Sequence, residues 1–222
     1  MSLNTQQSIK CPSCGLMQDM TVWDSITVKD SPDLKKDLLG GKLNIFKCSA
    51  CSHFGLVPTP MLYHDEEKKL MISFTPCNDE SLKKRLYENI CETSKASGEL
   101  EAFEEYNLRF VSEYNALLEK ILIFDAGLND KAIEVIKLLI LSQEPDKQNQ
   151  RICVFGKKEN DNLEFMIQDT KENMVYTSTV PLSTYDTIWQ QLRYSGVKPY
   201  SFGWEAVDAD YGAKLINGIN NI

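Results

Sequence analysis

Two Cys-x-x-Cys pairs near the beginning of the sequence constrain its fold more than any other feature. The first pair is Cys11 and Cys14, the second is Cys48 and Cys51, and 33 residues lie between the pairs. One such loop offers two thiolates from a single tight turn, so two loops can complete the tetrahedral shell of soft ligands that zinc prefers. We therefore expect these four cysteines to bind one structural Zn2+ ion, in a zinc ribbon with a long insertion.

The residues around the cysteines favour a structural metal over a catalytic one. Pro12 stiffens the first loop, and Gly15 permits the positive φ that directs backbone N–H groups towards the sulfurs. The second loop has Ser49 and Ser52 at the corresponding positions, so it is less pre-shaped. Four thiolates leave no open position for a water molecule, and we expect this zinc to carry out no chemistry.

Cysteine usage and hydropathy also bear on where the chain functions. Seven cysteines, four of them in the two pairs, are typical of metal binding in a reducing compartment rather than of a disulfide framework. The segment Met1–Lys10 is polar and lacks the apolar stretch of a secretory signal. No apolar run approaches the roughly 18 residues of a membrane span. We expect a cytoplasmic protein with no membrane segment.

The charge distribution argues against nucleic acid as a partner. The net charge is −8. Residues 1–76, which hold the cysteine pairs, contain eight basic and eight acidic residues, and residues 77–149 contain nine basic and fifteen acidic residues. Binding to phosphate backbones depends on Lys and Arg side chains that displace counterions. We therefore expect the partner to be another protein or a second copy of the chain.

Hydrophobic periodicity predicts an α+β fold: an N-terminal, zinc-ribbon-like, β-rich segment, then central helices, then a C-terminal β-meander with a helix. Alternating strands are expected up to residue 76. Helical patterns are expected at 79–94, 113–125 and 129–143, meander strands at 152–155, 163–167 and 174–179, and further helices at 183–192 and 209–216. Asn129 and Ser183 are the expected N-caps of the helices that begin after them.

The segment Glu144–Gln150 is the predicted linker, because it is polar and contains a proline that stops a helix. The predicted domains are therefore residues 1–145, the zinc-ribbon-like domain with the helices after it, and residues 151–222, a small α+β domain.

Several motifs together resemble the CpXC domain family, a prokaryotic group named for its paired cysteines. They are Cys11-Pro-Ser-Cys14-Gly15, Val22-Trp-Asp-Ser-Ile26, Lys47-Cys48-x-x-Cys51 and Leu62-Tyr-His-Asp65. The segment Glu119–Asp130 and the helix at Glu134–Ile140 are similar to the region C-terminal to the domain in many members. The resemblance covers roughly residues 1–145 and implies the fold and the metal, but no activity. The second loop departs from the family pattern at Ser49 and Ser52, while all four thiols remain.

The chain contains two histidines, so a histidine-dependent mechanism would use His53 or His64. His53 lies two residues after Cys51 and is expected beside the metal site rather than in it. The run His64-Asp65-Glu66 could bind a hard metal ion or act in general acid–base catalysis, whereas the alternative interpretation is a solvated turn between strands. The sequence contains no Gly-rich phosphate loop, G-x-S-x-G elbow or H-E-x-x-H helix.

These observations favour a zinc-binding, non-catalytic scaffold or protein-interaction module, with no catalytic residues assigned. Two alternatives from other classes stay open. One is a nucleic-acid-binding zinc ribbon, against which the charge argues. The other is a metal-dependent hydrolase that uses His64, Asp65 and Glu66.

Overall fold

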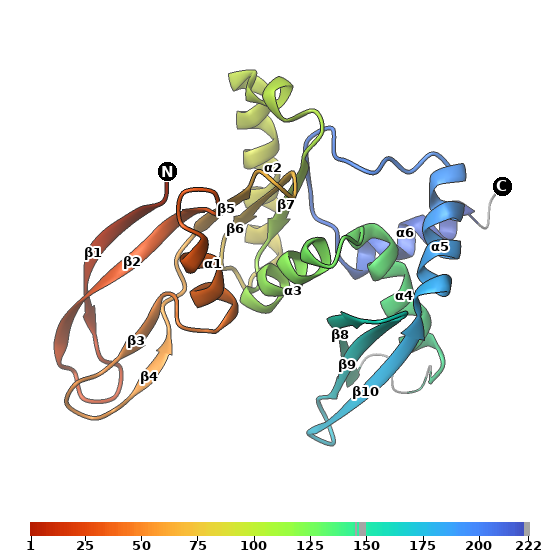
Figure 1. Ribbon diagram of the computed structural model, residues 1–222. Coiled ribbons are helices and arrows are strands. Elements are labelled where there is room, and N and C mark those ends of the chain that lie inside the picture. Colours follow the sequence, from red (N-terminus) through yellow and green to blue (C-terminus); the bar gives the residue numbers. More distant parts are fainter. Residues whose placement is uncertain (145, 147–149, 220–222) are drawn as a thin grey trace. The chain divides into compact units, whose positions relative to one another are not determined.

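The structure is a computed structural model that describes residues 1–144, 146 and 150–219 (Figure 1). Its contacts group the chain into two compact units. The first unit comprises Met1–Leu118 with Phe202–Trp204, and the second comprises Glu119–Ser201 with Glu205–Ile222. The predicted α+β class is confirmed. The first part of the chain is rich in strands, central helices follow it, and a β-meander with further helices comes last.

The first unit is built on a mixed six-stranded sheet in the order β1-β2-β5-β6-β7-β11. Its strands are β1 (Leu3–Lys10), β2 (Met17–Thr27), β5 (Met61–Asp65), β6 (Leu70–Phe74), β7 (Asn107–Val111) and β11 (Trp204–Glu205). The pairs β1–β2 and β5–β6 are antiparallel, whereas β2–β5 and β6–β7 are parallel. The helices are α1 (Pro32–Leu39), α2 (Glu80–Ser97), the 3-10 helix η1 (Glu99–Phe103) and the beginning of α3 (Tyr114–Asp125).

Two hairpins extend from this sheet. Strand β2 pairs with β1 over all eight residues of β1, but it pairs with β5 only from Ser25 to Thr27. A second hairpin, β3 (Ile45–Lys47) with β4 (Phe54–Leu56), forms a separate two-stranded sheet. Figure 1 shows the ends of the two hairpins near each other. Each hairpin turns at one of the Cys-x-x-Cys loops, so this arrangement brings the four cysteines to one place.

The short strand β11 is a feature that the sequence pattern did not predict. It lies at the edge of the sheet next to β7, and α2 holds it there. The Tyr87 hydroxyl donates to the Trp204 carbonyl at 2.9 Å, and the Trp204 indole N–H donates to the Ser94 hydroxyl at 2.8 Å. Two residues are too short a run for periodicity to reveal, so only these distant contacts define the strand.

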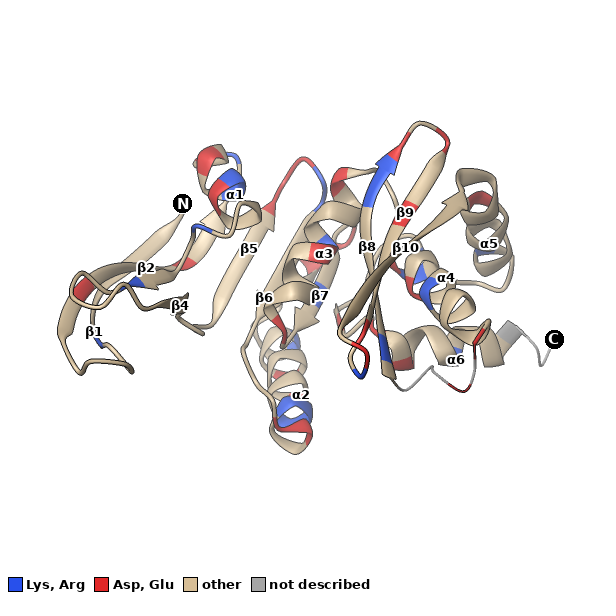
Figure 2. Ribbon diagram, turned by 90° about the horizontal axis from the view of Figure 1, so that it is seen from below, with Lys and Arg blue, Asp and Glu red and all other residues tan. Residues whose placement is uncertain are grey.

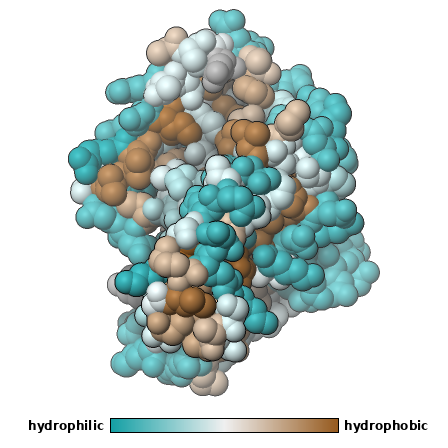
Figure 3. All heavy atoms as spheres, turned by 90° about the vertical axis from the view of Figure 1, so that its left-hand side faces the viewer, coloured by the Kyte–Doolittle hydropathy of each residue, from teal (hydrophilic) through white to brown (hydrophobic). Residues whose placement is uncertain are grey.

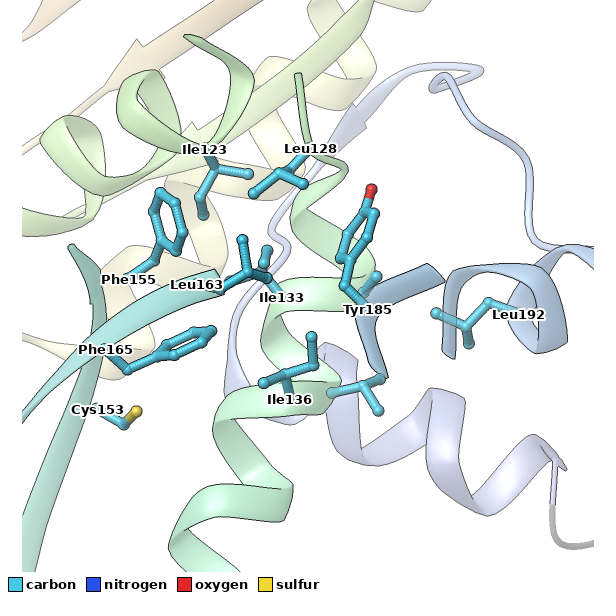
Figure 4. Close-up of a cluster of buried hydrophobic side chains, with 12 residues drawn as sticks. Ile123, Leu128, Ile133, Ile136, Cys153, Phe155, Leu163, Phe165, Tyr185 and Leu192 are labelled. Carbon is cyan, nitrogen blue, oxygen red and sulfur yellow. The ribbon is translucent and has the colours of Figure 1, made fainter. Parts of the chain in front are cut away.

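The second unit packs three helices with the predicted three-stranded meander. Its elements are α4 (Asp130–Ser142), β8 (Arg151–Glu159), β9 (Asn162–Asp169), β10 (Met174–Pro181), α5 (Leu182–Tyr194) and α6 (Ala209–Ile219). Side chains from these elements converge on one apolar core, which Figure 4 shows. Phe155, Leu163 and Phe165 enter it from the sheet, Ile133 and Ile136 from α4. The core therefore joins residues on both sides of the predicted linker.

A buried charge network lies beside this core. Lys120 pairs with Asp130 at 3.1 Å and with Glu134 at 3.0 Å, and Lys137 pairs with Glu119 and Glu134 at 3.0 and 3.1 Å. Glu119 also accepts a hydrogen bond from a backbone N–H of β8 at 2.6 Å. Burial alone lowers the pKa of Lys120, but the neighbouring carboxylates outweigh it and raise the pKa, so this lysine stays charged.

Two local predictions have different outcomes at the helix starts. Asn129 caps α4 as predicted, because its side chain accepts from the Lys131 N–H at 3.0 Å. The prediction that Ser183 caps α5 is wrong. Strand β10 runs directly into α5, Pro181 occupies the N-cap position, and Ser183 already lies in the first turn.

The domain boundary between residues 145 and 151 stays a prediction. Pro145 and residues 147–149 of the predicted linker lie outside the described residues. The two compact units of the structure instead meet in the sequence between Leu118 and Glu119. In the part of the chain that the structure describes, no helix combines the length and the apolar character needed to cross a membrane.

Candidate metal centre

The hairpin ends bring the four predicted ligands together. The Sγ atoms of Cys11, Cys14, Cys48 and Cys51 all lie within 4.8 Å of one another. The Cys11–Cys51 and Cys14–Cys48 sulfur pairs are each 3.6 Å apart. A tetrahedral zinc ion with Zn–S bonds of about 2.3 Å places its sulfurs about 3.8 Å apart. The donor set and its spacing therefore fit a metal ion of zinc's size and preference.

The cluster is half-buried. Cys11 and Cys48, the first cysteine of each loop, are buried and pack with Phe46 in a small core between the hairpins, flanked by Ile9 and Met20. The second cysteine of each loop is exposed. A metal ion held there would be anchored from the interior side and open to solvent at its other side.

The first loop closes through its own backbone. The Cys11 N–H donates to the Leu16 carbonyl at 2.8 Å, and the Gly15 N–H donates to the Cys11 carbonyl at 2.9 Å. Gly15 has a φ of 77°, in the left-handed region that glycine adopts without strain. The expected role of Gly15 in shaping this loop is consistent with that geometry.

The second loop is closed by a backbone hydrogen bond between the corresponding positions, although its sequence suits the required backbone conformation less well. The Cys48 N–H donates to the His53 carbonyl at 2.7 Å, and the Ala50 N–H lies 3.4 Å from the Cys48 sulfur. Ser52 has a φ of 58°, a left-handed conformation that costs a residue with a Cβ atom roughly 1–2 kcal/mol. The second loop thus closes against the backbone preference of Ser52.

Two amide side chains connect the second hairpin to β2, and the sequence pattern revealed neither. Gln18 lies on β2 and contacts the backbone on both sides of Cys48, through Lys47 and Ser49. Asn44, just before β3, accepts from the Trp23 N–H at 2.8 Å and donates to the Trp23 carbonyl at 3.0 Å. The only sequence signal for Gln18 is a polar side chain at an inward-facing position of a strand.

Backbone N–H groups favour thiolates at the buried cysteines. Burial raises the pKa of Cys11. Hydrogen bonds from the backbone of Cys14 and Ser13 and from the neighbouring thiols lower it by more, so that the pKa falls to about 6. The backbone N–H groups of Ala50 and Cys51 lower the pKa of Cys48. The backbone of Leu16 lowers the pKa of Cys14, but hydrogen bonds with the other thiols and burial outweigh it and raise the pKa to about 12. The loop backbones therefore stabilise negative sulfur, the form that binds metal, at Cys11 and Cys48.

The three side chains of the run His64-Asp65-Glu66 have different partners rather than one common centre. His64 Nε2 lies 3.2 Å from the Tyr106 hydroxyl, the Asp65 carboxylate pairs with Lys35 at 2.9 Å, and Glu66 pairs with Lys29 at 2.9 Å. His64 and Asp65 are the last residues of β5 and so point to opposite faces of the sheet. The turn itself begins at Glu66.

Asp65 behaves as a structural carboxylate. Burial raises the pKa of this group, but hydrogen bonds from Lys35, from the Lys68 N–H and from the Tyr63 hydroxyl lower it below its usual value. A carboxylate that accepts three hydrogen bonds has little capacity left for a metal ion or a substrate.

His53 does not belong to the cysteine cluster. Among the described residues, the four cysteines are the one group of His, Cys, Asp and Glu side chains with ligand atoms close enough to hold a metal ion. His53 contributes its carbonyl to the second loop rather than its ring.

The surface near the loops is mixed in character. Leu16, Met17 and Phe54 are exposed close to the ends of the hairpins. Figure 3, which faces the hairpins, shows hydrophobic groups among hydrophilic ones on this side. On α1 and α2, basic and acidic segments lie next to one another rather than in a continuous basic stretch (Figure 2). In this view, neither α1 nor α2 carries a continuous basic stripe of the kind expected for a nucleic-acid interface.

A four-cysteine cluster at the ends of two hairpins, in an α+β chain, defines a protein that could hold a metal ion in the manner of a zinc ribbon. A comparison with protein families identifies the family to which the chain belongs. The family described as CpXC protein matches residues 9–137, more than half of the chain, and the chain belongs to this family. Searches of curated proteins and of solved structures each found no match.

Proposed function

We propose that this chain is a non-catalytic scaffold, stabilised by Zn2+ at Cys11, Cys14, Cys48 and Cys51, that associates through protein–protein contacts. The donor set supports the choice of metal, because four thiolates in a tetrahedron suit zinc and leave no position for a substrate. No catalytic residue is part of the proposal, since the side chains of the His64-Asp65-Glu66 run are each engaged elsewhere.

The metal can be tested directly. Purified protein should contain one zinc per chain by elemental analysis, and Cys14→Ser and Cys48→Ser should each lose it. Cys77→Ser is the matched control, because Cys77 is a half-buried thiol outside the cluster. A protein that keeps its full thermal stability after verified removal of the metal would contradict the structural role.

The observation that supports protein–protein association is the outer face of the β8–β10 sheet. Residues at alternate positions of the three strands share this face, and the strand register places Ile152, Gln168 and Val175 in one row. Ile152, Met166 and Val175 expose 52%, 50% and 67% of their surface. A sheet with one face in water normally carries polar side chains there, so three exposed apolar side chains among the polar residues of this face support a contact with a partner.

Charge favours a second copy as the covering partner. The charged positions on this face are Lys157, Glu159 and Glu164, and Lys157 pairs with both carboxylates. Two chains that each carry a net charge of −8 repel each other at most surfaces, but at this face the carboxylates are already paired within their own chain, so the repulsion between two copies is weaker.

Sedimentation equilibrium tests this association. The wild type should self-associate as concentration rises, and Met166→Lys combined with Val175→Lys should shift the protein to monomer. Met174→Lys is the control, because Met174 is also half-exposed on β10 but lies at a position of the opposite face. A wild type that stays monomeric up to its solubility limit would remove self-association from the proposal.

The nucleic-acid alternative makes a separate prediction. If the chain bound nucleic acid, its affinity would fall steeply with salt concentration, because released counterions drive such contacts. We expect no retention of duplex or single strands near physiological ionic strength. Tight binding there with a steep salt slope would replace the scaffold proposal by the nucleic-acid one.

A further inference from the structure

The second metal-binding loop depends on a side chain from the other hairpin. Gln18 is half-buried on β2, beside Ile9 across the β1–β2 pair. Its Nε2 donates to the Lys47 carbonyl at 2.9 Å, and its Oε1 accepts from the Ser49 N–H at 3.0 Å. One amide group thus holds the two residues that flank Cys48. Both bonds lie within the length range of good N–H···O hydrogen bonds.

A comparison of the two loops explains why this contact is needed. The position after the first cysteine is Pro12 in the first loop, which has no N–H group, and Ser49 in the second, which has one. Gln18 accepts a hydrogen bond from that additional N–H. The second loop also forces Ser52 into a left-handed conformation, where the first has Gly15. Gln18 therefore supports the loop whose own sequence shapes it less well.

We infer that Gln18 is a positioning residue of the metal centre, which fixes Cys48 for zinc by holding the backbone on both sides of it and so substitutes for the proline that the second loop lacks. The inference rests on the proposed zinc site at the four cysteines. Gln18 touches no sulfur in this arrangement; it acts through the peptide groups next to a ligand. Such supporting hydrogen bonds usually contribute roughly 10- to 100-fold to metal affinity.

Zinc affinity of the full chain, measured by competition with a chromophoric chelator, tests the inference. Gln18→Ala should bind zinc roughly 10- to 100-fold more weakly than the wild type. Gln7→Ala is the matched control, since Gln7 is a half-buried glutamine of the same hairpin whose amide donates to Thr5. The absorption bands of the cobalt-substituted protein should change in Gln18→Ala and not in Gln7→Ala, because they report the geometry of the thiolates.

A double-substitution cycle separates positioning from general support of the fold. Ser49→Pro removes the N–H that donates to Gln18, so Gln18→Ala should weaken zinc binding less in that background than in the wild type. A loss of the same size in both backgrounds would overturn the inference. If Ser49→Pro does not fold, Gln18→Glu decides: it keeps the acceptor for the Ser49 N–H and loses the donor to the Lys47 carbonyl, so its affinity should lie between the wild type and Gln18→Ala.

The outcomes also distinguish this inference from the proposed function. A wild type that binds no zinc contradicts the proposed metal centre itself. A wild type that binds zinc, with Gln18→Ala equal to it in affinity and cobalt spectrum, contradicts only the role of Gln18.

Discussion

Ser52 has a strained backbone conformation that a single substitution can relieve. Its φ of 58° lies in the left-handed region, where glycine occupies the corresponding position of the first loop. Ser52→Gly should stabilise the zinc-loaded protein by about 0.5–1 kcal/mol, since the removed strain exceeds the extra entropy that glycine gains in the unfolded chain. Denaturant unfolding measures the change. Ser49→Gly is the matched control: Ser49 has no positive φ, so glycine there should not stabilise, and equal gains at both positions would refute the strain argument.

His64 should make stability depend on pH. Burial lowers the pKa of His64, and the nearby carboxylates of Glu66 and Asp65 oppose the shift only in part. The folded state therefore binds a proton less readily than the unfolded state, whose histidine titrates near 6.5. The stability that this group supports is complete above that pH and is lost as the pH falls below it.

The free energy of unfolding, measured between about pH 7.5 and 5.5, should fall less steeply in His64→Gln than in the wild type. His53→Gln serves as the comparison, since it removes the other histidine. A slope that disappears in His53→Gln and persists in His64→Gln would assign the pH dependence to His53 instead.

At the scale of single residues, the sequence predicted the four cysteines of the cluster and missed the side chains that contact the loops around them. The cysteines are recognisable because the spacing of each pair is typical of a metal-binding loop. Gln18 and Asn44 are not, because their partners Ser49 and Trp23 are 31 and 21 residues away, and a polar side chain in a strand has no local pattern that names its partner. Contacts of that kind depend on how two hairpins meet.

Among the elements, the packing of α6 against α4 depends on one glycine. A Cβ atom at Gly212 would lie 3.0 Å from Leu138 Cδ1 and 3.1 and 3.2 Å from two atoms of Glu134, one of them backbone. Gly212→Ala should destabilise the protein by about 1–2 kcal/mol, because the overpacking cost exceeds the gain in helix propensity. Gly218→Ala in the same helix should be neutral or stabilising, since a Cβ there meets nothing within 4 Å. Thermal unfolding compares the two, and equal effects would contradict the close approach.

Elements with strong periodicity were predicted well, and those defined by distant contacts were not. The meander strands and α4 carry a clear repeat of apolar residues and an N-cap, so local physics defines them. The strand β11 consists of two residues that α2 and β7 hold in place, and the start of α5 is determined by β10 rather than by its own serine. Where a neighbour decides the structure, the local sequence carries little of the information.

At the scale of the whole molecule, the two units should depend differently on the metal. The cysteine end of the first unit has a small core of Cys11, Phe46 and Cys48, so the binding energy of the proposed zinc, of order 10 kcal/mol, would be a large part of the stability of its hairpins. The described part of the second unit has a core of twelve buried residues, and the unit contains none of the four candidate ligands. Metal removal should therefore unfold β1–β4 and leave the second unit folded.

Hydrogen exchange of the chelated protein measures this and also locates the domain boundary. Amides of β1–β4 should lose protection, whereas those of β8–β10 should keep it. Helix α4 decides the boundary. Since Ile133 and Ile136 pack in one core with Phe165, we expect α4 to stay protected together with the meander, as the division after Leu118 implies. If α4 instead loses protection with β1–β4, the cooperative boundary lies between residues 145 and 151, where the sequence placed it. Loss of protection in every element at once would mean that the two units unfold as one and that the metal stabilises the entire chain.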